Sequence, residues 1–474
     1  MSKPNILLIT TDQQRFDTIH ALGNEFIYTP HLNWLVDEGI AFRRCYSDSP
    51  ICMPARATIM TGKHAYTHGL TGNRGGAMPM DPCSTLPGLL TRGGYQTRAQ
   101  GKMHFDPIRA NYGFEHMEIP LDYYRYMAEH PELGIPKGHG VSENEIEPVL
   151  STVDETHSAT HWTVKRSIDF LETRDETRPF FLWTSFAKPH PPFDPSPNYW
   201  ALYQNKPLPA PVYGGWSREI SDSLQGFYSS TYSLNNAYRM SEAQLLDVKR
   251  AYYACITQID YSLGLLFARM REMGLLEDTW IIFTSDHGDL MGDHHMCAKS
   301  VFLEGSAHIP MLVRPPQGIE PAQRGKHCDA LVTLADVMPT ILSIAGIDAP
   351  AGMDGADLRT LTTGDSKDRI FFGVSSDSYF AVIADGYKYN WTNIGGEELL
   401  FNLKDDPMEQ NDLSQAEPER ARRMKKMLAE HVSACRPELT KDGALIVNPA
   451  ITGPNDVRKW PGFHSTAYPT DVLH

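Results

Sequence analysis

The chain has 474 residues, of which 41% are hydrophobic and 21% charged, as in ordinary soluble globular proteins. Its 43 basic and 58 acidic residues leave a net charge of −15, which argues against nucleic acid and anionic membranes as partners. An anionic substrate would therefore need local cations or a bound metal ion to overcome the overall negative field. The length predicts two or three structural units.

The N-terminal residues contain one lysine and a five-residue apolar run, which is too short for the core of a signal peptide. No apolar stretch is long enough for a membrane-spanning helix. The sequence therefore predicts a cytoplasmic protein. Its seven cysteines are an odd number without a CxxC pair, so neither a disulfide framework nor a zinc site is expected.

The first predicted element is a strand at Asn5–Thr10, a continuous apolar run typical of a parallel strand that is covered on both faces. Asp12 and Gln13 follow its end. A helix is then predicted from Pro30, which suits the first turn, with Gly39 as a C-terminal stop.

A distinctive pattern, Cys-x-Pro-x-Arg, stands at residues 52–56. Pro54 suits the first turn of a helix, and residues 55–60 continue as one. Cys52 would then lie at a helix N-terminus, where free N–H groups favour an anion, and Arg56 one turn later could steady it. The pattern by itself is equally compatible with a buried cysteine that only packs.

Two later apolar runs, Pro179–Thr184 and Trp280–Thr284, are predicted strands that lead into polar residues. His190 follows the first of them, and Asp286 and His287 follow the second. In open α/β sheets, ligands bind beyond the carboxyl ends of the strands. These side chains and those after the first strand are therefore expected to meet at one edge of the sheet.

Between these two strands, Ser241 and Gln244 form a predicted capping box that opens a long amphipathic helix, on which Cys255 is expected to pack in the core. Beyond about residue 365 the pattern changes to three short antiparallel strands and a charged helix, at residues 369–374, 379–384, 399–402 and 417–432. We therefore predict an α/β catalytic domain at 1–365 and a smaller α+β subdomain with an irregular tail at 366–474.

The segment 111–155 has few regular patterns and is predicted to be an insertion that shapes the pocket. Aromatic residues of this segment and of the tail either pack or line a sugar or cation site; they are Tyr123, Tyr124, Tyr126, Trp460 and Phe463. A proline-rich tail with aromatics could also reach a neighbouring subunit, so a homo-oligomer is a further possibility.

With Thr58, Thr61, Gly62 and Lys63 after it, the Cys-x-Pro-x-Arg pattern resembles the sulfatase family of the alkaline phosphatase-like superfamily. Residues 399–413 resemble that family's C-terminal segment. The resemblance implies an α/β fold with a large mixed, mostly parallel sheet flanked by helices, and a smaller C-terminal α+β subdomain. It also implies that a formylglycine-generating enzyme converts Cys52 to formylglycine (3-oxoalanine).

The resemblance further implies one divalent metal ion, with ligands Asp12, Gln13, Cys52, Asp286 and His287. Oxygen ligands of this kind suit hard cations, so Ca²⁺ is expected first, with Mg²⁺ and Mn²⁺ left open. The chain departs from the common pattern at two of these positions. An acid is usual where Gln13 stands, and asparagine is frequent where His287 stands.

Three further segments resemble cationic motifs of the family, and their matched residues are Lys102, His104, His190 and Lys299. The implied mechanism begins with attack on sulfur by the hydrated formylglycine, which Arg56 helps to hold. Lys102 and Lys299 hold the sulfate oxygens. His190 protonates the departing alcohol, and His104 takes the proton whose loss releases sulfate, although these two roles could be exchanged.

The predicted function is hydrolysis of a sulfate monoester of a sugar, an aryl alcohol or a small alkyl alcohol such as choline. The alternative is a phosphonate monoester or phosphodiester hydrolase, which shares the scaffold and the Asp12-Gln13 start. Those enzymes tend to carry uncharged residues where this chain has Lys102 and His104, so the sulfatase is favoured. A catalytically inactive binding protein is disfavoured because every core residue of the family is present.

Overall fold

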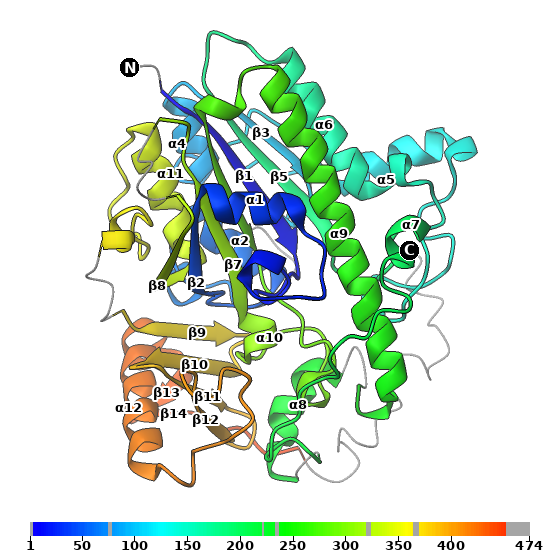
Figure 1. Cartoon of the computed structure of the whole chain (residues 1–474). Coiled ribbons are helices and arrows are strands. Elements are labelled where there is room, and N and C mark those ends of the chain that lie inside the picture. The colour runs from blue at the N-terminus through cyan, green and yellow to red at the C-terminus, as the bar shows by residue number, and fades with distance from the viewer. Residues whose placement is uncertain are drawn as a thin grey trace.

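The computed structural model describes residues 3–73, 78–219, 222–232, 237–318, 324–363 and 369–451. Its body is one large sheet with helices on both faces (Figure 1), and the strand order is β4-β3-β5-β1-β6-β7-β2-β8. The strands are β1 (Asn5–Asp12), β2 (Ile40–Tyr46), β3 (Gln96–Gly101), β4 (His116–Glu118), β5 (Phe180–Pro189), β6 (Thr279–Ser285), β7 (His308–Arg314) and β8 (Lys326–Thr333). Only β7 runs antiparallel to its neighbours, which confirms the predicted mixed, mostly parallel sheet.

The helices are α1 (Pro30–Glu38), α2 (Cys52–Thr61), α3 (Ala65–His68), α4 (Leu86–Arg92), α5 (Pro120–Glu129), α6 (Ala159–Thr173), α7 (Pro197–Ala201), α8 (Gln225–Tyr232), α9 (Glu242–Glu272), α10 (Glu304–Ala307), α11 (Val337–Ala345) and α12 (Pro418–Cys435). In the part of the chain that the structure describes, none of them is apolar over enough of its length to cross a bilayer.

The central strand β1 shows why the apolar run does not alternate. Ile6 and Leu8 pack into one hydrophobic core with residues of α2, α4 and α11. Leu7 and Ile9 point to the other face, where α1, α6 and α9 cover the sheet. Because both faces are buried, all four residues from Ile6 to Ile9 are apolar.

The long helix α9 begins as predicted, since the Ser241 side chain accepts from Gln244 N–H and the Gln244 side chain accepts from Ser241 N–H. Cys255 is buried on its packed face. Helix α1 ends at Glu38 with Gly39 as its C-cap, which confirms the predicted stop, and Gly39 has an extended backbone (φ −133). A Cβ there would lie 2.6 Å from the Val313 carbonyl oxygen, so close approach to β7 explains the glycine.

A second, antiparallel sheet with the order β12-β11-β10-β9 lies beside the large one, with α12 packed against it (Figure 1). Its strands are β9 (Phe371–Ser375), β10 (Tyr379–Ala384), β11 (Tyr387–Thr392) and β12 (Glu398–Asn402), and a short hairpin of β13 (Thr440–Lys441) and β14 (Ala444–Leu445) follows. Strand β11 was not predicted, because the polar residues Lys388 and Asn390 interrupt its apolar pattern although both are buried. The domain boundary at residue 365 stays a prediction.

The segment 111–155 is more regular than its sequence indicated, because it contains the edge strand β4 and the helix α5. Tyr123 on α5 is buried, and its ring centroid lies 5.8 Å from that of Trp162 on α6. Tyr124 and Tyr126 are partly exposed. The aromatic residues predicted in the tail, Trp460 and Phe463, lie outside the described residues.

Candidate active site

The ends of β1 and β6 and the start of α2 meet at one edge of the large sheet. Thr11 pairs with Ser285 in the parallel register of β1 and β6, so Asp12 and Asp286 leave the sheet side by side. Together with Cys52 and His287, these two carboxylates form a cluster in which one ligand atom of each residue lies within 4.8 Å of the others. All four residues are buried.

Cys52 is the first residue of α2, which confirms the predicted position at a helix N-terminus. Its Sγ lies 3.2 Å from His287 Nε2, 3.6 Å from Lys299 Nζ and 3.7 Å from Asp12 Oδ1. Burial and Asp12 oppose ionisation, but Lys299, Lys102 and His287 outweigh them and lower the pKa of the thiol well below its ordinary value. A nucleophile at this position is therefore held in a locally positive environment.

Arg56 is fully buried one turn into α2, and it braces the carboxylates. Its guanidinium donates to Asp286 Oδ2 at 3.1 Å and to Asp12 Oδ2 at 3.3 Å. It also donates to Ser185 Oγ at 2.9 Å and to the Lys102 carbonyl oxygen. These hydrogen bonds hold the guanidinium group in place near residue 52, on which Arg56 acts through its positive charge.

Lys102 enters the cluster from the end of β3. Its Nζ lies 2.7 Å from Asp12 Oδ2. Gly101 before it has φ 96, and a Cβ there would lie 2.0 Å from the Ser185 carbonyl oxygen, so only glycine lets β3 run this close to β5. Burial opposes the ammonium charge, but Asp12 and Cys52 together outweigh burial and raise the pKa of Lys102.

The two predicted proton-transfer residues differ in their surroundings. His190 is buried after β5. Its Nδ1 lies 2.9 Å from the Pro191 carbonyl oxygen, which can only accept, so Nδ1 carries a hydrogen and Nε2 is the ring nitrogen left for another partner. Burial, then Lys102 and Lys299, lower the pKa of His190 well below its ordinary value. His104 has a left-handed backbone (φ 52), and its buried Nδ1 has no hydrogen-bond partner among the described residues.

The donor set of the cluster fits a divalent cation. Burial, then the neighbouring Asp12, raise the pKa of Asp286, because a buried carboxyl group beside a second carboxylate is harder to ionise. His287 Nδ1–H donates to the Gly288 carbonyl oxygen at 3.0 Å, so the lone pair of Nε2 faces the cluster. Two carboxylate groups and one imidazole beside the side chain of residue 52 would suit a hard or borderline metal ion.

Gln13, the other predicted ligand, has contacts of its own. Its Oε1 accepts from Lys299 Nζ at 2.6 Å, and its Nε2 donates to Asp289 Oδ2. Its role as a metal ligand stays a prediction. Sequence reasoning missed Asp289 and Ser185, although both stand in the polar stretches that follow or end the predicted strands.

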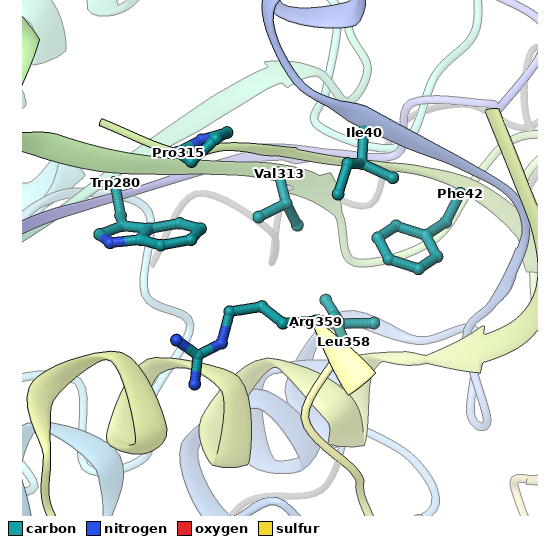
Figure 2. Close-up of a pocket in the computed structure, with 7 residues that line it drawn as sticks. All are labelled: Ile40, Phe42, Trp280, Val313, Pro315, Leu358 and Arg359. Atoms are coloured by element: carbon teal, nitrogen blue, oxygen red, sulfur yellow. The ribbon is translucent and has the colours of Figure 1, made fainter. Parts of the chain in front are cut away.

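His294 has a packing role: the centroid of its ring lies 4.7 Å from that of Trp216 in a stacked arrangement, and its Nδ1 lies 2.8 Å from Ser217 Oγ. A small cavity lies at the opposite, amino-terminal end of β2 and β6 (Figure 2). It is lined by Ile40, Phe42, Trp280, Val313, Pro315, Leu358 and Arg359. This mostly apolar lining offers no group for catalysis or metal binding.

Known proteins are similar to this chain in sequence and in fold. A sequence model of the family described as Sulfatase matches residues 4–347, and one described as N-sulphoglucosamine sulphohydrolase, C-terminal, matches 292–437. An arylsulfatase of Clostridium perfringens is 34% identical over 446 residues, which cover 88% of this chain and 91% of that protein. A choline-sulfatase of Rhizobium meliloti is 30% identical over 441 residues, covering 87% and 83%. A phosphonate monoester hydrolase of Agrobacterium radiobacter, 24% identical, shares the fold with a TM-score of 0.75 over 94% of this chain and 100% of that one.

Proposed function

Since the chain belongs to the sulfatase family and is thus a sulfuric ester hydrolase, we propose that it cleaves a sulfate monoester with a formylglycine nucleophile made from Cys52. The observation that carries this proposal is the place of Cys52. It opens α2 within 4.8 Å of Asp12, Asp286 and His287, and Lys299 is its other neighbour. A purely structural cysteine would not need two carboxylates and a buried ammonium around its sulfur.

We propose that Asp12, Asp286, His287 and residue 52 hold one divalent metal ion, with Gln13 as a further ligand. Such an ion would act as a Lewis acid toward the nucleophile and the sulfate oxygens. Ca²⁺ is the first candidate because most of the donors are oxygen atoms, and Mg²⁺ and Mn²⁺ are the alternatives.

We propose one catalytic step for each of these residues. Hydrated formylglycine carries two hydroxyl groups on one carbon. One of them, after losing its proton to solvent beside Lys102 and Lys299, attacks sulfur as an oxyanion while the bond from sulfur to the alcohol oxygen breaks. Lys102 and Lys299 hold the non-bridging sulfate oxygens while charge moves from the nucleophile to the leaving oxygen. His190 donates a proton from Nε2 to that oxygen, so the alcohol leaves neutral.

The product of this step is a sulfate ester on residue 52 with one hydroxyl remaining. His104 takes the proton of that hydroxyl, the carbon–oxygen bond to sulfate breaks, and the aldehyde re-forms. Water then adds to the aldehyde and restores the diol. The second hydroxyl thus explains why the site would use formylglycine: sulfate leaves without a second attack at sulfur.

The substrate class follows from the relatives only in outline. The two relatives described above are named for aryl sulfates and for choline sulfate, so an aryl or small alkyl sulfate is the first choice, and a sulfated sugar is the other candidate. A phosphonate monoester or phosphodiester hydrolase is the second candidate function, since Gln13 and His287 depart from the usual sulfatase ligands. The charges of Lys102 and the imidazole of His104 favour the sulfate ester.

The test pairs mass spectrometry with an activity panel. The peptide that contains Cys52 should show the mass change from CH₂SH to CHO, and sulfate esters should turn over faster than phosphonate monoesters and phosphodiesters. Cys52→Ala is the control and should be inactive on all three. An aldehyde with faster phosphonate turnover would select the second candidate, and an unmodified thiol in active protein would refute the nucleophile.

A further inference from the structure

Asp289 is a fully buried carboxylate beside the site that no step proposed above uses. Its Oδ1 accepts hydrogen bonds from the backbone N–H groups of Met291 at 2.8 Å and Ala298 at 2.9 Å. Its Oδ2 accepts from Gln13 Nε2. The carboxylate is therefore committed to three donors of the chain.

Gln13 links Asp289 to Lys299 through the two ends of its side-chain amide. Its Oε1 accepts from Lys299 Nζ at 2.6 Å, and the same Nζ lies 3.6 Å from Cys52 Sγ. A primary amide has one donating end and one accepting end. Because Asp289 takes the donating end, the accepting end has to face the ammonium group.

Hydrogen bonds also fix the backbone of Gln13. The side chain therefore cannot adapt to a substitution at Asp289 by a shift of its own backbone. Gln13 N–H donates to Asp286 Oδ1 at 3.0 Å, and the Gln13 carbonyl oxygen accepts from Tyr252 Oη at 2.6 Å. Its φ of 76 is a left-handed conformation that the surroundings have to stabilise.

Asp289 also shapes the loop that carries Lys299. Leu290 N–H donates to the Ala298 carbonyl oxygen at 2.8 Å, which brings the two ends of the loop together, and the Ala298 N–H bond to Asp289 closes it. Ala298 has φ 64, and the next residue is Lys299. The Asp289 carboxylate thus orients the Gln13 amide, which accepts from Lys299, and it also fixes the backbone that precedes Lys299.

We infer that Asp289 is a positioning residue for sulfate ester hydrolysis, which acts through Gln13 to place the Lys299 ammonium group beside residue 52. The inference rests on the proposed function and adds to it a residue outside the ligand set and the cationic residues. Loss of this placement is expected to reduce catalysis because Lys299 would no longer meet the sulfate oxygens at the right distance.

Asp289→Asn tests the chain of hydrogen bonds from Asp289 through Gln13 to Lys299, because it replaces one carboxylate oxygen with an NH₂ group. An asparagine oxygen can keep the two backbone bonds, but its NH₂ group would then face the NH₂ group of Gln13. Gln13 relieves this by turning its amide, which presents NH₂ to Lys299 and displaces the ammonium group. We expect kcat/KM to fall about 10- to 100-fold, as for other residues that orient a site from outside it.

The double variant Asp289→Asn with Gln13→Glu exchanges the amide and the carboxylate. The carboxylate introduced at position 13 would accept from the asparagine NH₂ group and from Lys299, so the direction of every hydrogen bond is complementary again. We expect the exchange to recover most of the activity that Asp289→Asn loses. Asp293→Asn is the matched control: Asp293 is buried in the same loop but pairs with Arg15 at 2.7 Å, so adding Gln13→Glu should not rescue it.

The readouts separate positioning from folding and from metal loading. Thermal unfolding and metal content are measured for each variant, and crystal structures of Asp289→Asn and of the double variant report the place of Lys299. A double variant that is folded, loaded with metal and no more active than Asp289→Asn would overturn the inference. If Asp289→Asn does not fold, Gln13→Glu alone replaces it, and the double variant has to be the more active of the two.

Failure of the proposed function has a different signature. A wild-type protein that turns over no sulfate ester removes the proposed function, whatever the variants do. The two crystal structures then test by themselves whether Asp289 places Lys299 through Gln13. Lys299 has to move away from residue 52 in Asp289→Asn and return in the double variant. An unmoved Lys299 overturns the inference.

Discussion

Lys102 Nζ lies 2.7 Å from Asp12 Oδ2, and this contact joins the residues proposed to bind the sulfate group to those proposed to bind the metal ion. Burial opposes ionisation of Asp12, but Lys102, His190, Arg56 and Lys299 outweigh it and hold the pKa of the carboxyl well below its ordinary range. Asp12 is therefore kept as a carboxylate, and Lys102 is kept charged at a fixed place beside it.

Lys102→Met is expected to lower kcat/KM for a sulfate ester at least about 100-fold, because one preorganised donor to the sulfate oxygens is lost. Steady-state kinetics with the metal-loaded protein checks this value. Lys249→Met is the matched control, since Lys249 is also buried but donates to the Pro209 carbonyl oxygen away from the cluster. Equal losses in the two variants would contradict the assigned role of Lys102.

His190→Asn should act differently on good and poor leaving groups. A nitrophenolate leaves without a proton, whereas an alkoxide needs one, so kcat/KM should fall far more for an alkyl sulfate than for nitrophenyl sulfate. His104→Asn acts after the alcohol has left, so it should slow turnover of both esters to the same rate. The opposite pattern would show that the two histidines have exchanged roles.

The pH dependence follows from the lowered pKa of His190. Burial, then Lys102 and Lys299, favour the neutral imidazole, so the free enzyme lacks the proton at neutral pH. Because the general acid has to carry that proton, kcat/KM for an alkyl sulfate should rise as pH falls and level off below the pKa. A pH profile of kcat/KM checks the sign, and His190→Asn should lose this slope.

Removal of the metal ion should abolish activity and lower the midpoint of thermal unfolding. A ligand that binds only the folded state at 100 times its Kd stabilises that state by about 2.7 kcal/mol. Dialysis against a chelator, with metal content measured, should be followed by return of Ca²⁺, Mg²⁺ or Mn²⁺ in separate samples. Full activity in protein shown to be free of metal would contradict the assignment of Asp12 and Asp286 as ligands.

Lys388→Met should reduce the free energy of unfolding by about 3 to 5 kcal/mol, because it leaves two carboxylates buried without their cation. Lys388 Nζ, fully buried on β11, lies 2.6 Å from Glu304 Oε1 and 2.7 Å from Glu409 Oε1. Urea unfolding measures the change.

The matched control for Lys388→Met is Arg43→Gln. Arg43 pairs with Asp329 at 2.6 Å, but the two side chains are 50% and 64% exposed. An exposed pair of this kind contributes at most about 1 kcal/mol. A loss for Lys388→Met as small as that of the control would show that the buried pairing is not required for stability.

Local sequence patterns were sufficient for the elements that carry the site. The apolar runs of β1 and β6 are buried on both faces, which is why they could be read without an alternating pattern. Cys52 begins α2 because Pro54 and the residues after it favour a helix there. Strand β11 was missed because Lys388 is polar, and its burial depends on Glu304 and Glu409 from other segments.

The sequence by itself determined the order of the central strands along the chain, the helix that opens at Cys52 and the kinds of side chain that reach the sheet edge. These follow from local patterns of hydrophobicity and from the backbone preferences of proline. Only the tertiary structure decided that Arg56 binds the two carboxylates and that Gln13 links Asp289 to Lys299. Such contacts join residues that lie far apart in the chain, and their geometry depends on strand register and loop closure, which no local pattern encodes.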